Sequence, residues 1–326
     1  MTARNPEAVL AALKKARTIL LISHISPDGD TIGSNLALRL GLERLGKTVT
    51  SVCADPVPRN LRMLPESDRF LTPDQVGDER FDLVMSVDCG DLKRTGDSAR
   101  LFALGADTAQ VDHHGTNDGF TAHNDVDADA PAVALLVHGY LKALGVTLDP
   151  DIASCLYAGL STDTGNFAFP STGSASFAAM AELMEAGLPL DRMNRALFRE
   201  RPAAQVRLLT RALQSLRFYA DDRVTVMTLT QRDFEECGAL PEYSDTVVNF
   251  GLDIVGVKLT ALVRETADGK VKASLRALQP YRVDEIAHAV GGGGHALAAG
   301  CTMTGITLRD AAERLRQAME AELARA

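Results

Sequence analysis

The stretch Thr18–Asp30, TILLISHISPDGD, decides the fold of this chain. It opens with TILLIS, an apolar run of strand length, and closes with a polar cluster that contains an imidazole and two carboxylates. Apolar residues then recur at helical spacing over 33–45, and 47–53 alternates as a half-buried strand does. A strand, a helix and a second strand in this order predict a βαβ unit, whose two strands run parallel in one sheet.

The same alternation continues through the first half of the chain. Apolar runs at 82–87 and 108–111 each end in polar residues, and helical patterns follow at about 131–145 and 150–160. A helical pattern also precedes the first strand, at about 5–17. We therefore predict an α/β domain with a mainly parallel sheet flanked by helices. Ligands bind beyond the carboxyl ends of the strands in such sheets, so the polar clusters mark the expected site.

The second half of the chain has the pattern of a smaller α+β domain. Strands are expected at 224–229, 254–264 and 270–278. An Asp268-Gly269 turn, typical of a hairpin, joins the last two. Helical patterns at about 283–290 and 307–324 would cover one face of this sheet.

A connection between the two domains is expected where the pattern changes. Ala-rich helical patterns run through about 173–217 and are interrupted by Pro202, which suits a linker. We predict two domains with a cleft between them and a linker: a catalytic domain at 1–188, a helical linker at 189–215 and a smaller substrate-binding domain at 216–326.

Composition and charge argue against several classes of protein. The 326 residues are 46% hydrophobic and 24% charged, and no stretch approaches the roughly 20 consecutive apolar residues of a membrane span. The five cysteines are widely spaced without a C-x-x-C pair, and Met1–Arg17 lacks a secretory apolar region, so a soluble cytoplasmic protein with reduced thiols is expected. A net charge of −9 argues against coating of long nucleic acid. The acidity is either a solubility field or a set of cation ligands.

Polar clusters follow the expected strands of the first domain. His24, Asp28 and Asp30 lie in one short segment, where a metal site and a loop that caps the next helix are equally good interpretations. Further clusters at the same sheet edge favour the metal site: Asp88-Cys89-Gly90-Asp91, Asp112-His113-His114 and Ser161-Thr162-Asp163-Thr164-Gly165. Oxygen ligands with a minority of imidazole suit Mn²⁺ or Mg²⁺, and two ions about 3.5–4 Å apart would serve phosphoryl transfer.

These clusters resemble the four motifs of the DHH phosphoesterases, a family named for the Asp-His-His triplet. The matching motifs are His24-x-x-Pro27-Asp28-Gly29-Asp30 with Gly33-Ser34, Asp88, Asp112-His113-His114 and Asp163-Thr164-Gly165. Near the C-terminus, 291–295 and 298–300 resemble the glycine-rich motif of the family's associated second domain. Length and domain pairing are most similar to the NrnA-like subgroup, whose members degrade very short RNA oligonucleotides and dephosphorylate 3′-phosphoadenosine 5′-phosphate (pAp).

The resemblance implies a role for each residue of the first domain. The implied metal ligands are His24 and Asp28 for one Mn²⁺, Asp30 and His113 for the other, Asp88 as a catalytic bridge, and Asp163, which completes the cluster. Mg²⁺ is the alternative ion. His114 would either act in catalysis, by binding phosphate or protonating a leaving group, or orient Asp112 or His113. Asp112 is expected to support its neighbours.

Substrate-binding groups are expected in the second domain. Consecutive glycines let backbone N–H groups approach an anion, so Gly293 and Gly294 would cradle a phosphate beside His295; a flexible turn is the alternative. Arg276 on the preceding strand would bind a phosphate or a base through its guanidinium. Arg94 in the first domain is a further candidate, with an ordinary surface arginine as the alternative.

The chain departs from the family's pattern at one place. In relatives the helix after the triplet often begins with Ser or Thr and carries a Glu, whereas here the stretch 129–134 reads DAPAVA. A polar contact that supports the site is therefore expected to be lost. His123 and His138 belong to no motif and are expected to be ordinary surface or core residues.

The resemblance implies a Mn²⁺-dependent phosphoesterase, an exoribonuclease in which metal-activated water attacks phosphorus in line. Short RNA oligonucleotides and pAp would be its substrates, held in a local pocket. Two rivals stay open: a cyclic-dinucleotide phosphodiesterase or pyrophosphatase that uses the same site, and a non-catalytic nucleotide-binding regulatory module. No membrane partner is expected, and the sequence leaves a homodimer open.

Overall fold

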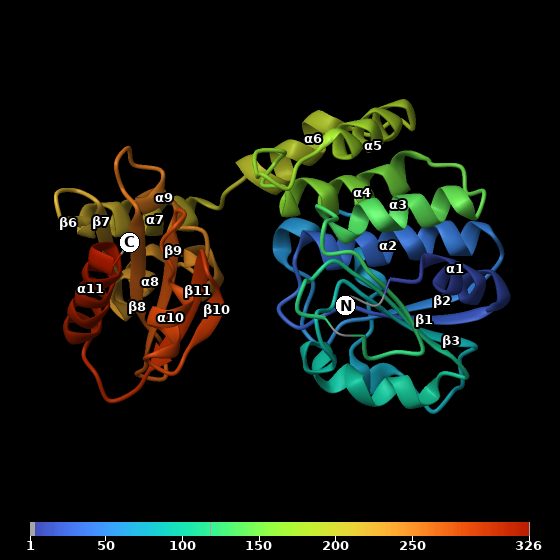
Figure 1. The fold of residues 1–326 in the computed structure, drawn as a ribbon, viewed down its shortest axis with the longest axis horizontal. Helices are drawn as coiled ribbons and strands as arrows, with labels where there is room; N and C mark the ends of the chain where they lie inside the picture. The colour runs from blue at the N-terminus through green and yellow to red at the C-terminus, as the bar shows by residue number, and fades with distance from the viewer. Residues whose placement is uncertain (1–3, 118, 326) are drawn as a thin grey trace. The chain divides into compact units, whose positions relative to one another are not determined.

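The computed structural model describes residues 4–117 and 119–325 (Figure 1). It separates into two compact units, Met1–Glu200 and Arg201–Ala326. The boundary falls inside the segment predicted as a linker. None of the helices within the described residues is long and apolar enough to cross a bilayer.

The first unit is built on a parallel sheet, as predicted. Its strands lie in the order β2 (Thr48–Val52), β1 (Thr18–Ile22), β3 (Leu83–Val87), β4 (Thr108–Asp112) and β5 (His123–Val126), and every neighbouring pair is parallel. Strand β5 was not predicted, because its sequence, HNDV, is too polar for the strand pattern. His123 is therefore a strand residue at the edge of the sheet.

Both faces of this sheet are buried, which explains the unbroken apolar run of β1. Ile19 and Leu21 point to the larger core, whereas Leu20 and Ile22 point to a second core on the opposite face. The larger core contains α1 (Pro6–Lys15), α2 (Gly29–Arg44), α3 (Val133–Ala143) and α4 (Pro150–Asp163). The 3₁₀ segment η4 (Leu92–Leu104) covers the opposite face (Figure 1).

Shorter elements complete the first unit. Helices α5 (Ser174–Glu185) and α6 (Leu190–Asn194) pack on the outer side of α4 (Figure 1). The remaining helical turns are η1 (Arg59–Leu61), η2 (Ser67–Arg69), η3 (Pro73–Gln75) and the π-helical turn η5 (Arg195–Arg199).

Helices α2 and α4 approach each other closely because glycines face the contact. A Cβ on Gly33 would lie 2.4 Å from the carbonyl oxygen of Cys155, and one on Gly159 would lie 2.5 Å from Oδ1 of Asp30. This packing brings the N-terminus of α2 against the last turns of α4, which carry Asp163.

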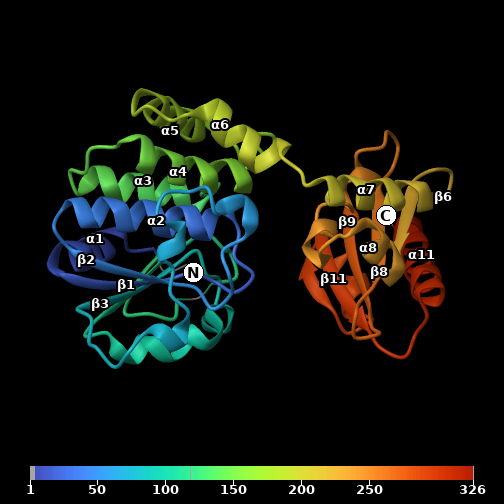
Figure 2. The same cartoon turned by 180° about the vertical axis from the view of Figure 1, so that it is seen from behind.

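The second unit is an α+β fold on a six-stranded sheet (Figure 2). Its strands lie in the order β10 (Gly293–His295), β11 (Ala298–Met303), β9 (Val271–Ala277), β8 (Leu259–Glu265), β7 (Val224–Leu229) and β6 (Arg217–Tyr219). The sheet is mixed, since only β7 and β8 pair in parallel. The predicted turn joins β8 to β9, with Gly269 in a left-handed conformation.

Helices bury one face of this second sheet and part of the other. As predicted, α10 (Asp284–His288) and α11 (Leu308–Arg325) pack on one face. On the other face, β7 and β8 are covered by α7 (Ala203–Ser215), α8 (Gln231–Cys237) and α9 (Asn249–Leu252), with the turn η6 (Pro241–Ser244) beside them. All five cysteines of the chain are buried free thiols.

Candidate metal centre

The loop after β1 places two of the predicted ligands, and it is shorter than the sequence pattern suggested. Helix α2 begins at Gly29 rather than near Gly33, because Oδ1 of Asp28 accepts hydrogen bonds from the backbone N–H groups of Asp30 and Thr31 (3.0 and 3.1 Å). Asp28 therefore caps the helix while its side chain stays about half exposed (54%). His24 is buried, and its Nε2 lies 3.7 Å from Oδ1 of Asp28.

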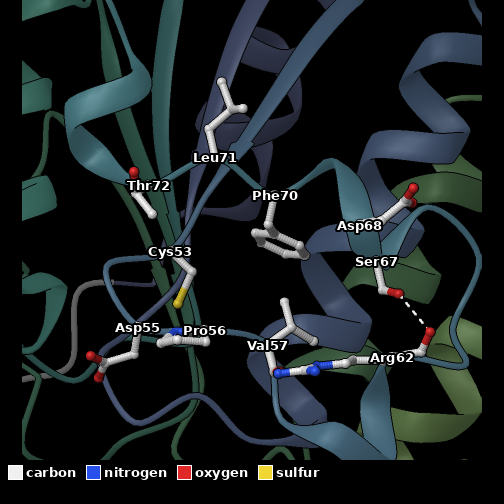
Figure 3. Close-up of a pocket in the computed structure, with 10 residues that line it drawn as sticks. All are labelled: Cys53, Asp55, Pro56, Val57, Arg62, Ser67, Asp68, Phe70, Leu71 and Thr72. Carbon is white, nitrogen blue, oxygen red and sulfur yellow. Dashed lines mark hydrogen bonds between the residues drawn. The ribbon is translucent and has the colours of Figure 1, made fainter.

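Residues after β2 hold this loop from behind. Oδ2 of Asp55 accepts a hydrogen bond from the backbone N–H of Ser26 (2.6 Å), which has a left-handed conformation (φ 52°). The thiol of Cys53 donates to the carbonyl oxygen of His24 (3.4 Å). Both side chains also line a mainly apolar pocket of about 260 Å³, in which Figure 3 shows Phe70 on the side away from Cys53 and Asp55. The loop that carries His24 and Asp28 is thus fixed from outside the motif.

Asp88 occupies the central position of the site. It follows β3, the middle strand of the sheet, in a left-handed conformation (φ 59°), which is uncommon outside glycine. Its Oδ2 lies 3.6 Å from Nε2 of His24, and its Oδ1 lies 3.6 Å from Nε2 of His113. Within residues 4–117 and 119–325, Oδ1 of Asp88 is buried and has no hydrogen-bond partner.

The Asp-His-His triplet lies at the end of β4, and its two histidines have different partners. Nε2 of His113 lies 3.2 Å from Oδ2 of Asp163, while its Nδ1 lies 3.0 Å from the carbonyl oxygen of Ala130. His114 instead pairs its Nδ1 with Oδ1 of Asp112 at 2.8 Å. Asp112 is fully buried, and its Oδ2 also accepts a hydrogen bond from Nδ2 of Asn117 (2.7 Å).

Asp30 accepts most of its hydrogen bonds from backbone N–H groups. It is fully buried, and its two carboxylate oxygens accept hydrogen bonds from the N–H groups of Val133 and Ala134 at the start of α3 (2.5 and 2.9 Å). Ser34 adds a hydroxyl at 2.9 Å. The positive end of α3 therefore stabilises this carboxylate, so the DAPAVA stretch supplies polar contacts despite its apolar side chains.

Three overlapping groups in the described part of the chain could hold a metal ion. Within each group the candidate ligand atoms lie within 4.8 Å of one another. The groups are His24, Asp28 and Asp88; Asp30, His113 and Asp163; and Asp88, His113 and His114. The structure thus brings together all six residues predicted as ligands, with Asp88 between the other two sets.

Without a bound cation, the carboxylates of the site repel one another. Burial by itself would lower the pKa of His24 and of His113, but the neighbouring carboxylates raise each pKa to about 10. The pKa of Asp30 is raised by burial and by the like charges of Asp88 and Asp163. The carboxylates are therefore closer together than their mutual repulsion favours.

The residues fit a pair of divalent cations. The set consists of carboxylate oxygens with a minority of imidazole nitrogens, the ligand chemistry of Mn²⁺ and Mg²⁺. Oδ1 of Asp88 is buried without a hydrogen-bond partner among the described residues, which is unfavourable. A cation bound at this oxygen would supply the missing partner. Cations at this place would also offset the repulsion among Asp30, Asp88 and Asp163.

Comparison with known proteins agrees with this arrangement. Residues 18–160 match the model of the DHH family, N-terminal domain, and residues 222–325 match that of the DHHA1 domain. The chain is 34% identical over 308 residues to the bifunctional oligoribonuclease and PAP phosphatase NrnA of Thermus thermophilus, covering 94% of this chain and 91% of the relative. The chain belongs to the DHH family. Like the family, it is a phosphoesterase.

Two further relatives of this DHH protein span almost the whole chain. The bifunctional oligoribonuclease and PAP phosphatase NrnA of Bacillus subtilis is 25% identical over 291 residues, which is 88% of this chain and 89% of the relative. The crystal structure of an exopolyphosphatase-related protein from Bacteroides fragilis superposes with a TM-score of 0.90 at 25% identity, over 97% of this chain and 95% of the other. Both units therefore have counterparts in these relatives.

The DHHA1 unit brings together the residues predicted to bind substrate. The strand register places His295 opposite Ala298 and Ala298 opposite Arg276, so the imidazole and the guanidinium flank a small side chain on one face. Gly293 lies on that same face with open space where a Cβ would be. Gly294 faces the other way, and its φ of 144° requires glycine.

This face of the DHHA1 unit is rich in cations. Burial raises the pKa of Asp245, whereas the nearby Lys272, Arg264 and Arg276 lower it. Lys272 and Arg276 alternate along β9 on the face away from the α11 core. Glu242 is a second acidic neighbour of Asp245, so three cations stand against two carboxylates, an excess of positive charge that suits a phosphate.

Arg94 lies at the metal centre rather than on a distant surface. Its Nη2 is 3.1 Å from Nδ1 of His24, although that ring nitrogen also lies 2.8 Å from the carbonyl oxygen of Ile25. A guanidinium can only donate, so its contact requires Nδ1 to be unprotonated, whereas the contact with the carbonyl oxygen of Ile25 requires a proton on Nδ1. The two hydrogen bonds therefore cannot form at the same time. Arg94 therefore lies within reach of the candidate metal site, as a substrate-binding residue would.

Sequence reasoning missed three supporting features of this DHH site. They are the Asp55 carboxylate behind the first loop, the Asn117 amide behind Asp112, and the backbone N–H groups at the start of α3. Asp55 lies three residues after the end of β2, so a carboxylate after this strand was the sequence signal for it. The N–H groups of α3 carry no signal in side-chain identity.

Proposed function

We propose that this DHH protein is a Mn²⁺-dependent exoribonuclease of short RNA oligonucleotides that also dephosphorylates pAp, with Mg²⁺ as the alternative ion. The observation that carries the proposal is the position of Asp88, buried between two sets of ligands with one oxygen unpartnered. The named activities of the Thermus and Bacillus relatives supply the substrate class. The free cysteines agree with a cytoplasmic enzyme.

The proposed ligands divide as the predicted motifs do. His24 and Asp28 would hold one cation, Asp30, His113 and Asp163 the other, and Asp88 would contact both. When bound, such a pair lowers the pKa of a coordinated water and offsets the charge that develops on a phosphoryl group. A side-chain nucleophile is not required by this chemistry.

The protein's own groups would complete the reaction. Asp112 holds Nδ1 of His114 and raises its pKa through that hydrogen bond, which favours the protonated ring. We propose that His114 delivers a proton to the leaving oxygen of the substrate. In the first unit Arg94 would bind a phosphate. In the second unit Arg276, His295 and the N–H groups of the glycine segment would bind a phosphate or a base.

The proposal is tested with purified full-length protein on four substrates in the presence of Mn²⁺. These are a five-nucleotide RNA, pAp, a cyclic dinucleotide and pyrophosphate. We expect hydrolysis of the RNA and of pAp. Preferential hydrolysis of the cyclic dinucleotide or of pyrophosphate would favour the rival enzyme activities, and tight nucleotide binding without turnover of any substrate would favour a regulatory module.

The metal assignment is tested by Asp88→Asn, which keeps the size of the side chain. Turnover should fall by at least about three orders of magnitude, because a bridging carboxylate supports both cations. Far-UV circular dichroism should be unchanged. Asp74→Asn, at a side chain that is 95% exposed, is the matched control and should keep full activity. Unaltered turnover of Asp88→Asn would contradict the proposed site.

A further inference from the structure

A second cavity lies beyond the end of α4, where the chain continues from Asp163. It is an open pocket of about 510 Å³, lined by residues of α4, the segment after it, α5 and α6. Its polar and aromatic lining consists of Tyr157, Asn166, Phe167, Asp191 and Asn194. The function derived above uses none of these residues. This volume is within the range of small-molecule sites.

The backbone beside the cavity is strained. Asn166 and Phe167 both have left-handed conformations (φ 56° and 65°), and for a bulky residue such as Phe167 this is a rare and unfavourable state. Specific hydrogen bonds hold it: the N–H of Asn166 donates to the carbonyl oxygen of Ser161 (2.6 Å), and that of Phe167 donates to Oγ1 of Thr164 (3.1 Å). These hydrogen bonds keep Phe167 in its unfavourable backbone conformation, so the ring is held in one position beside the cavity.

Aromatic rings line and extend the cavity. The ring of Phe167 lies 6.4 Å from that of Tyr157 and 5.6 Å from that of Phe177, with interplanar angles of 34° and 31°. Phe177 is 57% exposed although its ring is large and apolar. These three rings are tilted against one another, and the exposed ring of Phe177 lies at one end, so together they offer aromatic surface to a flat heterocycle.

The hydrogen-bonding groups of the cavity are complementary to a base edge. Nδ2 of Asn194 donates to the hydroxyl of Tyr157 (3.1 Å) and to Oδ1 of Asn166 (3.2 Å), so both of its hydrogens are used. In the described part of the chain no hydrogen bond uses Oδ1 of Asn194 or Nδ2 of Asn166. Asn194 therefore offers an acceptor and Asn166 a donor, the two kinds of group that a nucleobase edge satisfies.

We propose that this cavity binds a nucleobase of the substrate, stacked on Phe167 and hydrogen-bonded by Asn166 and Asn194; this inference rests on the proposed function. The lining residues carry no Lys or Arg, while Asp191 adds negative charge, so the cavity suits an uncharged base and not a phosphate. The strained segment joins the cavity to Asp163 through two residues, Thr164 and Gly165. A base held here would position a nucleotide relative to the metal centre.

The test is binding of adenosine to the full-length protein, measured by calorimetry without added metal. Adenosine carries a base but no phosphate, so neither hydrolysis nor the cation site contributes. Phe167→Leu and Asn194→Ala should each weaken binding roughly tenfold, the cost of losing a stacked ring or a base contact. The matched controls Phe218→Leu and Asn60→Ala, at exposed positions outside the cavity, should bind as wild type does.

Absence of adenosine binding, or equal binding by the wild type and by Phe167→Leu and Asn194→Ala, would overturn this inference. Kinetics with pAp provide a second readout, since loss of a base contact should raise KM more than it lowers kcat. Adenosine binding is measured without turnover, whereas the proposed function fails if the wild type hydrolyses none of its substrates. The two failures are therefore distinguishable.

Discussion

Asp88 combines three properties that rarely occur together at one carboxylate. It is buried, it has left-handed backbone geometry, and one of its oxygens has no partner among the described residues. Each property is unfavourable for the protein alone. A bound cation would explain why all three properties occur at the centre of the candidate ligand set, because the cation would be the missing partner of Asp88.

Asp55 illustrates how a residue outside every motif controls ligands within one. Replacing it by Ala removes the acceptor for the N–H of Ser26 and frees the loop between His24 and Asp28. We expect the apparent affinity for Mn²⁺ to fall roughly 10- to 100-fold, the usual cost of losing a group that orients metal ligands. Titration of activity with Mn²⁺ measures this effect.

Two variants sharpen that test. Asp55→Asn keeps an oxygen that can accept from Ser26, so it should recover most of the affinity that Asp55→Ala loses. Asp74→Ala removes an exposed carboxylate and should change nothing. Equal metal affinity of Asp55→Ala and the wild type would show that the loop is held by other contacts.

His138 predicts a pH dependence of stability away from the metal centre. Burial lowers its pKa below the ordinary value of 6.5, and Nε2 lies 3.1 Å from Oε2 of Glu182, which opposes that shift. Because the unfolded chain binds this proton more readily, His138 costs stability as pH falls through about 6.5 toward the lower folded value. His138→Gln should show a smaller loss of unfolding free energy between pH 7.5 and pH 5.5, measured in urea; an identical slope would contradict the assignment.

At the scale of elements, the contact between α2 and α4 positions the site. Asp30 begins one helix and Asp163 ends the other, and the two approach because Gly33 and Gly159 lack a Cβ. Helix α3 then directs its first N–H groups at Asp30. The geometry of the ligands is thus a consequence of helix packing as much as of the motifs themselves.

Gly33→Ala tests this contact. Alanine normally stabilises a helix interior relative to glycine by up to about 1 kcal/mol, but here the new Cβ would meet the backbone oxygen of Cys155 at 2.4 Å. We expect destabilisation of about 1–3 kcal/mol from overpacking, together with reduced activity. Gly139→Ala in α3, where no atom lies within 4 Å of the new Cβ, should instead stabilise the protein. Urea unfolding of both variants decides between these signs.

At the scale of the whole molecule, each unit has its own hydrophobic core. The two cores of the first unit draw on residues 9–197, and the two cores of the second draw on residues 208–323. The residues proposed to act divide accordingly, with the proposed metal ligands in the first unit and Arg276 and His295 in the second. We infer that these units are separate domains joined by the segment around Glu200.

The second unit should therefore fold alone. A fragment of residues 201–326 is expected to unfold cooperatively in urea and to show dispersed amide signals in solution NMR. Arg276→Ala in that fragment should leave the unfolding midpoint nearly unchanged and remove the signal shifts caused by added pAp. A fragment without cooperative unfolding would show that the second unit depends on the first.

Much of the fold and of the site could be predicted from residue patterns. The apolar runs of β1 and β3 identify buried parallel strands because both faces of the sheet are covered. The same topology gathers the polar residues that follow these strands at one edge of the sheet, where they form the candidate metal site. Strand β5 was missed because an edge strand needs no apolar run, and the early start of α2 was missed because Asp28 serves as a cap.

The sequence by itself determined the chemistry of this protein: the α/β pattern, the aspartates and histidines at the strand ends, and the glycine segment of the second unit. Only the tertiary structure decided how those groups are held. Asp55 holds the loop that contains Ser26, and the N–H groups of α3 hold Asp30; both contacts join segments that are distant along the chain, and no local pattern records them. The same holds for the open cavity beside Phe167, since the four segments that line it come together only once the helices have packed.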